Sequence, residues 1–190
     1  LQGESPWGRG HARLTPTLRR QLYDGVAPCL GGTTTLVYDP RSEAVATSFL
    51  SLGGTARNCA GGATPWGSWL SCEETNATRG SWLGADHGYV FEVPARATPT
   101  LEAPAPLVGL GRFVHEAVAV DPGTGILYLT EDRGDGLLYR FLPSQPGKLV
   151  AGGRLQALSL RDQRGAATHN WSGQAIPLGR ELSVSWVDLR

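Results

Sequence analysis

The sequence lacks several features that would point to particular classes of protein. It has no methionine, one lysine (Lys148) among its 17 basic residues, and no apolar run long enough to cross a bilayer. The 17 basic and 17 acidic residues balance without a run of like charge, so nothing electrostatic favours nucleic acid or an anionic membrane as a partner. Because the chain starts at Leu1 and shows no signal peptide, we expect a piece of a larger or processed protein.

Cysteine is also scarce. The three cysteines (Cys29, Cys59 and Cys72) form neither a CxxC pair nor a disulfide framework, so at least one thiol is expected to be free. Glycine and proline are abundant instead, with 26 and 13 residues, which predicts many turns. Dense turns with short strand-like runs between them are typical of an all-β protein, and 190 residues suffice for one ordinary domain core.

Three strand-like runs recur at a spacing of about fifty residues. They begin at Thr33, His87 and Gly136, are rich in β-branched and aromatic residues, and end near a proline. A repeated four-stranded antiparallel unit of this length favours a β-propeller blade over a sandwich. We expect residues 1–30 to be a decoration or linker and residues 31–190 to be a partial propeller of roughly three blades, near residues 31–86, 87–135 and 136–190.

Local patterns refine this picture. In "TPTLRRQLYDGV" a threonine is placed to cap a helical turn. Residues 117–121 and 126–130 are expected to pair as a hairpin around an Asp121 turn, in which the aspartate side chain bonds the backbone. Residues 151–190 contain two more alternating strands, "GGRLQALSL" and "ELSVSWVDL", which we assign to a further, incomplete blade.

The innermost strands of propeller blades deliver loop residues to a central channel, so equivalent positions in successive repeats converge. A thiolate among carboxylates suits ferric iron or zinc, whereas oxygen ligands alone suit calcium or magnesium, so the mixture indicates more than one metal. The side chains predicted to converge are Cys59, Glu73, Glu74, His115, Glu116, Glu131 and Asp132.

Arg57, Arg112 and Arg133 lie beside these groups, and a guanidinium offers paired donors that match phosphate oxygens, which suggests phosphoryl chemistry. Each residue also has a simpler interpretation. Cys59 is as readily a small buried hydrophobe, the acids are solvated charges or arginine partners, and His115 is a core or surface histidine. Cys72 is expected to be buried, on the strand face opposite to the adjacent Glu73.

Three segments, "NCAGGATPWGSWLSCEE", "GRFVHEAVAVDPGTGILYLTEDRGDGLLYRFLP" and "GGRLQAL", resemble in order and spacing the PhoX family of bacterial alkaline phosphatases. The likeness runs from about Gly31 to Trp186. It implies a six-bladed propeller, exported by the twin-arginine route, that hydrolyses phosphomonoesters with oxo-bridged iron and calcium. It also implies that Cys59 binds iron and that Glu116 bridges metals, while Glu73, Glu131 and Asp132 fall where the family's motifs carry acids.

The chain departs from the family pattern, because the upstream Asn-His-Glu motif and the downstream Arg-Pro-Glu segment do not occur in it. We therefore expect a PhoX-like iron- and calcium-dependent phosphatase or a fragment of one, inactive as an isolated chain. The resemblance implies a periplasmic or secreted bacterial protein, monomeric at full length, acting on a small phosphomonoester. Metal-site roles are expected for Cys59, Glu73, Glu116, Glu131 and Asp132, catalytic roles for Glu116 and Arg133, and weaker roles for Glu74, His115, Arg57 and Arg112.

Two alternatives stay open. One is a non-catalytic secreted propeller that serves as a binding module. The other is a calcium-only propeller hydrolase acting on lactones or phytate, which gives Cys59 no role.

Overall fold

The computed structural model describes residues 15–26, 29–80, 82–163, 165–171, 173 and 176–189, and β-sheet dominates them. The helix α1 (Pro16–Arg19) precedes the strands, and Thr15 caps it by accepting a hydrogen bond from the Leu18 N–H at 3.2 Å, as predicted. Of the decoration or linker expected at residues 1–30, residues 1–14, 27 and 28 lie outside the described ones. Among the described residues, no helix has the length and apolar character needed to cross a membrane.

In the described part of the chain the strands are short, and two single 3-10 turns lie between them. The strands are β1 (Gly31–Asp39), β2 (Ala44–Thr55), β3 (Asn58–Ala63), β4 (Ser68–Glu73), β5 (Val90–Pro94), β6 (His115–Val120), β7 (Leu127–Glu131), β8 (Leu138–Pro143), β9 (Gly153–Leu160) and β10 (Val184–Asp188). The 3-10 turns are Val108–Leu110 and Leu149–Ala151.

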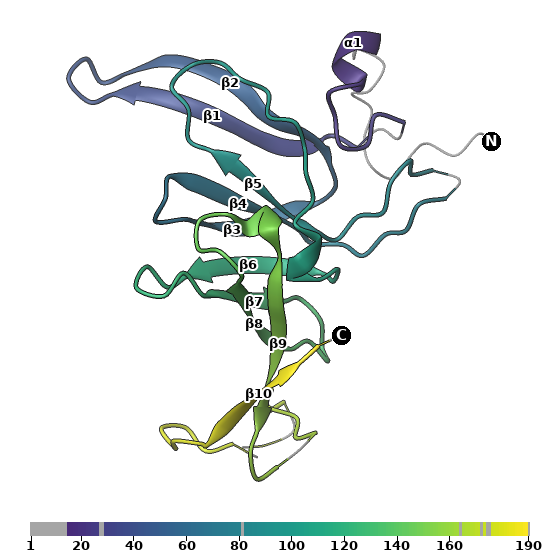
Figure 1. The fold of residues 1–190 in the computed structure, drawn as a ribbon, viewed down its shortest axis with the longest axis vertical. Helices are drawn as coiled ribbons and strands as arrows, with labels where there is room; N and C mark the ends of the chain where they lie inside the picture. The colour runs from purple at the N-terminus through teal and green to yellow at the C-terminus, as the bar shows by residue number, and fades with distance from the viewer. Residues whose placement is uncertain are drawn as a thin grey trace.

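These strands form three antiparallel sheets that follow one another along the chain. Their orders are β1-β2, then β3-β4-β5, then β6-β7-β8-β9-β10. Figure 1 shows the sheets succeeding one another down the long axis of the molecule, with β3 beside β6 where the second and third sheets meet. Within the described residues the sheets leave a ring open. The fold is therefore all-β and forms part of a β-propeller, as the sequence predicts.

The β6–β7 hairpin shows how the sequence specifies its turns. The Asp121 carboxylate accepts hydrogen bonds from the Gly123 N–H at 3.0 Å and the Thr124 hydroxyl at 2.5 Å. The Gly125 N–H donates to the Asp121 carbonyl at 2.8 Å, in a glycine with φ of 72° that a side chain would disfavour. These contacts confirm both the hairpin and the predicted role of Asp121.

The units of the sequence repeat and the sheets of the structure begin at different residues. The strand-like run beginning at His87 contains β5, which is the third strand of the sheet that starts with β3. The run beginning at Gly136 contains β8, which is the third strand of the sheet that starts with β6. The two strands predicted within residues 151–190 both form, as β9 and β10. They pair with each other, and β9 continues the antiparallel ladder along the edge of β8.

The largest core cluster joins the second and third sheets. Its fully buried members include Leu70 of β4, Leu127 of β7 and Phe141 of β8. The seam is the contact between β3, the first strand of the second sheet, and β6, the first strand of the third sheet. The two strands approach closely there, because a Cβ on Gly62 of β3 would lie 1.9 Å from the Val118 carbonyl oxygen of β6. Only a residue without a side chain allows this approach, which sets the distance between the strands that carry the site.

Candidate metal centre

The second and third sheets repeat the same strand register around the site. Asn58 of β3 pairs with Glu73 of β4, and His115 of β6 pairs with Glu131 of β7. An irregularity follows each pair, between Asn58 and Gly61 in one sheet and between His115 and Val118 in the other. The next residues, Cys59 and Glu116, are therefore equivalent, and so are Glu74 and Asp132 at the ends of the facing strands.

These four equivalent positions come together at the seam. One ligand atom from each of Cys59, Glu74 and Glu116 lies within 4.8 Å of the others. The Cys59 Sγ donates a hydrogen bond to Glu116 Oε1 at 3.3 Å, and the Asp132 side chain is hydrogen-bonded to Glu74. The backbone of Val114 aligns the two acids, because Glu74 forms a β-bridge with it and the Asp132 N–H donates to its carbonyl at 3.0 Å.

The electrostatics of this cluster favour a cation. The hydrogen bond to Glu116 raises the pKa of the Cys59 thiol, and the hydrogen bond to Asp132 raises the pKa of Glu74. Both shifts mean that negative charges crowd one another. Arg57 offsets them in part, through an ion pair of 3.5 Å between its NH2 nitrogen and Glu74 Oε2. A bound metal ion would relieve the same repulsion.

Glu73, predicted as a metal ligand, lies apart from this cluster. It is fully buried, and both of its oxygens are engaged. Its Oε1 bonds the Ala56 N–H at 2.8 Å and His87 Nδ1 at 2.7 Å, while Oε2 accepts from the N–H groups of Gly88 at 2.7 Å and Tyr89 at 3.2 Å. These contacts hold the entry to β5.

Glu131 occupies the equivalent position in the third sheet and does the equivalent work. Its Oε2 accepts hydrogen bonds from the Leu137 N–H at 3.2 Å and the Tyr139 hydroxyl at 2.8 Å, at the entry to β8. Successive residues of a strand point to opposite faces, so the second acid of each pair, Glu74 or Asp132, shares the face of Cys59 and Glu116. The same alternation, applied to the acid pairs in the sequence, identifies Glu74 as the acid of its pair that joins the cluster.

His115 also turns away from the cluster. It is fully buried and lies against Phe113, with ring centroids 3.6 Å apart. Its Nε2 lies 3.3 Å from the Gly111 carbonyl oxygen, and no described residue bonds its Nδ1. Burial lowers the pKa of His115 to about 4, so its ring is neutral at pH 7. The structure therefore places His115 in the core.

The three arginines have separate surroundings. Arg57 borders the cluster, and its Nε also donates to the Glu74 carbonyl at 3.0 Å. Arg112 instead joins two segments of the chain, by donating hydrogen bonds to the carbonyls of His87 and Asn76 at 2.8 Å each.

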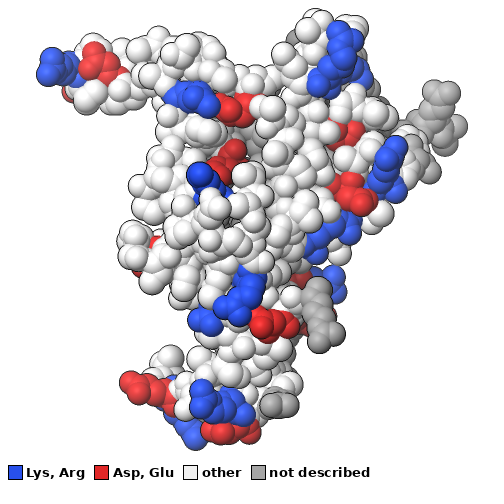
Figure 2. Space-filling view, in the orientation of Figure 1, with Lys and Arg blue, Asp and Glu red and all other residues white. Residues whose placement is uncertain are grey.

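On the face of the molecule drawn in Figure 2, cationic and anionic side chains are interspersed.

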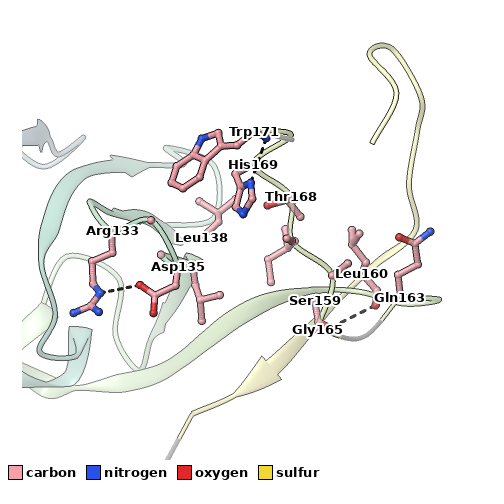
Figure 3. Close-up of a pocket in the computed structure, with 16 residues that line it drawn as sticks. Arg133, Asp135, Leu138, Ser159, Leu160, Gln163, Gly165, Thr168, His169 and Trp171 are labelled. Carbon is pink, nitrogen blue, oxygen red and sulfur yellow. Dashed lines mark hydrogen bonds and ion pairs between the residues drawn. The ribbon is translucent and has the colours of Figure 1, made fainter. Parts of the chain in front are cut away.

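Arg133 stands at the rim of a cavity of about 500 Å³. Its Nε donates to Asp135 Oδ1 at 3.0 Å. His169 and Trp171 line the same cavity, with stacked rings whose centroids are 4.3 Å apart. Figure 3 shows Arg133 and Asp135 on one side of the cavity and the two stacked rings above Leu138. Arg133 and the two aromatic rings therefore line opposite parts of one cavity.

Comparisons with known proteins place the chain in a family context. The family model described as alkaline phosphatase PhoX matches residues 30–190. Among solved structures, the chain is similar to Pseudomonas fluorescens PhoX in complex with vanadate, a transition state analogue, at 21% identity and a TM-score of 0.43. That match covers 68% of this chain and 32% of the Pseudomonas chain. No curated protein matches the chain.

Proposed function

Because the chain belongs to the PhoX family of alkaline phosphatases, we propose that it supplies the thiolate and carboxylate side of the metal centre in a phosphomonoester hydrolase. The observation that carries the proposal is the convergence of Cys59, Glu74 and Glu116 from two sheets within 4.8 Å. The matched part covers about a third of the solved relative, 32% of its length, so the activity proposed is that of the whole protein.

The donor set fits the metals that the family resemblance implies. A thiolate favours a transition metal such as ferric iron, and carboxylates serve both iron and calcium. Cys59 would hold iron, and Glu116, which accepts a hydrogen bond from the Cys59 thiol, would share a second ion. Glu74 and Asp132 supply further oxygens on the same face, whereas Glu73 and Glu131 are bonded at the strand entries. Metals bound here would contribute positive charge that stabilises a transferring phosphoryl group.

The arginines provide the groups that recognise phosphate. Arg57, beside Glu74, lies nearest to the acidic cluster through its 3.5 Å ion pair. Arg133 follows Asp132 directly in the chain and is about half exposed, so exchanging Asp135 for a phosphate oxygen costs little desolvation. We assign phosphate binding to Arg133, with the adjoining cavity available to the alcohol portion of the ester. The substrate is then a small phosphomonoester, and the protein acts in the periplasm or outside the cell.

The experiment compares Glu74→Gln with Asp121→Asn in the native protein. Glu74→Gln removes a charge from the cluster, so iron content and hydrolysis of p-nitrophenyl phosphate should each fall at least tenfold. Asp121 lies at the opposite end of β6 from Glu116, and its variant should keep both. A protein that purifies without iron and hydrolyses nothing would instead be a binding module. A colourless, calcium-only enzyme would contradict the role of Cys59.

A further inference from the structure

A second group of metal-capable side chains lies in the interior. Asp24 follows α1, Cys29 precedes β1, and His87 precedes β5. All three are buried, with 1%, 3% and 0% of their surface exposed. One ligand atom from each lies within 4.8 Å of the other two. Three polar side chains of different kinds thus share one enclosed point, where their desolvation must be offset.

The atoms that interact in this group also have the spacing of ligands around one metal ion. His87 Nε2 lies 3.6 Å from Cys29 Sγ and 3.4 Å from Asp24 Oδ2. Bond lengths to zinc and a tetrahedral angle place such ligand atoms about 3.5 Å (S to N) and about 3.3 Å (N to O) apart. A buried nitrogen–oxygen hydrogen bond is normally about 2.7 to 3.2 Å long. The direct His87–Asp24 ion pair is therefore a long one, and its length is close to the separation of two ligand atoms across a tetrahedral ion.

Neighbouring groups orient the ligands toward this point. Glu73 Oε1 bonds His87 Nδ1 at 2.7 Å, which leaves Nε2 to face Cys29 and Asp24. The Gly84 N–H donates to Asp24 Oδ2 at 2.7 Å and fixes the carboxylate. A histidine that ligates a metal commonly has its other nitrogen bonded to a carboxylate in this manner. Glu73 therefore acts as a positioning residue.

We propose that Asp24, Cys29 and His87 bind one Zn²⁺ ion, with water in the fourth position. Zinc suits a mixed sulfur, nitrogen and oxygen set, whereas calcium takes oxygen ligands only. On binding, the Cys29 thiol and the protonated His87 ring each release a proton to solvent, and the ion offsets the charges of the thiolate and of Asp24. The site is separate from the Cys59 cluster, because Glu73 and Glu74 point to opposite sides. It would fasten the chain before β1 to the segment before β5.

The test uses the native protein carrying Cys59→Ser, so that Cys59 contributes no thiolate to a metal. After removal of metals, Co²⁺ is added as a coloured substitute for Zn²⁺. We expect one equivalent to give the absorption of a tetrahedral thiolate–cobalt site, and Zn²⁺ to displace it. Adding Cys29→Ser should abolish the thiolate band, while adding Cys72→Ser, which changes another buried cysteine, should leave it unchanged. Asp24→Asn should weaken Co²⁺ binding at least tenfold.

A measurement without variants guards against misfolding. Elemental analysis of the native protein grown with zinc should find one zinc ion per chain, and adding Zn²⁺ to metal-free protein should raise its melting temperature. The proposal is overturned if zinc is absent, or if the cobalt thiolate band survives Cys29→Ser. Loss of phosphatase activity plays no part in either readout, so the zinc site and the proposed function stand or fall separately.

Discussion

At the scale of single residues, adjacent acids do different work in this protein. Glu73 is buried and satisfied by backbone N–H groups and His87, while Glu74, one residue later, joins Cys59 and Glu116. The third sheet repeats this division between Glu131 and Asp132. The cause is strand alternation, which sends the first acid toward the next strand's entry and the second toward the seam.

The two cysteines of the second sheet should respond differently to the same substitution. Cys59→Ser replaces a thiolate ligand by a hydroxyl that stays protonated near neutral pH, so iron, visible absorbance and turnover should be lost together. Cys72 is fully buried, as the sequence predicts, and burial raises the pKa of its thiol to about 12. Cys72→Ser should cost about 1 to 3 kcal/mol of stability and keep the metals. Elemental analysis and absorbance decide, and full iron in Cys59→Ser would refute the metal-site interpretation.

At the scale of strands and turns, the seam between β3 and β6 controls the site. Cys59 and Glu116 belong to different sheets and meet only because these two strands lie against each other. The β6–β7 turn at the far end of β6 is held by Asp121, and a register irregularity between His115 and Val118 separates it from the ligands.

Gly62→Ala tests the close approach of β3 and β6. Its Cβ would meet the Val118 carbonyl at 1.9 Å, so the strands must separate, at a cost of about 3 kcal/mol or more in unfolding free energy. Metal affinity should fall as Cys59 moves from Glu116. Gly123→Ala is the matched control, since its Cβ would meet nothing nearer than Asp121 Oδ1 at 3.5 Å. Urea denaturation and metal titration measure both effects, and equal stability of the two variants would contradict the packing argument.

The Asp121 turn carries a pH dependence of definite sign. Hydrogen bonds from the Thr124 hydroxyl and then the Gly123 N–H lower the pKa of Asp121 below its ordinary value of 3.8. Because the folded pKa is depressed, the stabilisation is present above pH 3.8 and is lost as pH falls through the folded value. Thr124→Val removes the larger contribution, so the carboxyl should titrate closer to 3.8. Carboxyl-resolved NMR titration checks this, and an unchanged pKa would show that the hydroxyl bond does not form.

At the scale of the whole molecule, the described residues form three sheets without ring closure. The β1–β2 hairpin extends from the rest of the molecule in Figure 1, and large apolar side chains on it are exposed, among them Leu36 at 62%, Tyr38 at 56% and Val45 at 54%. Exposed strand edges and apolar side chains of this kind favour association with other strands.

The 190-residue chain on its own should therefore self-associate and lack phosphatase activity, even with iron and calcium supplied. A longer protein in which further blades covered the same edges should be a monomer. Light scattering coupled to size-exclusion chromatography, with a p-nitrophenyl phosphate assay on each fraction, compares the two. A soluble, active monomer of the short chain would contradict this expectation.

The sequence by itself determined the fold class, the β6–β7 hairpin with its Asp121 turn, and the strands β9 and β10, because period-two alternation and turn chemistry act between near neighbours in the chain. It also marked Cys59 and Glu116 as equivalent corners of two repeats. Tertiary structure decided which acid of each pair joins them, since that depends on the cross-strand register and on backbone donors such as Gly88, which capture Glu73. It likewise placed His115 in the core and brought Asp24 and Cys29 to His87, contacts that no local pattern encodes because they join segments about sixty residues apart.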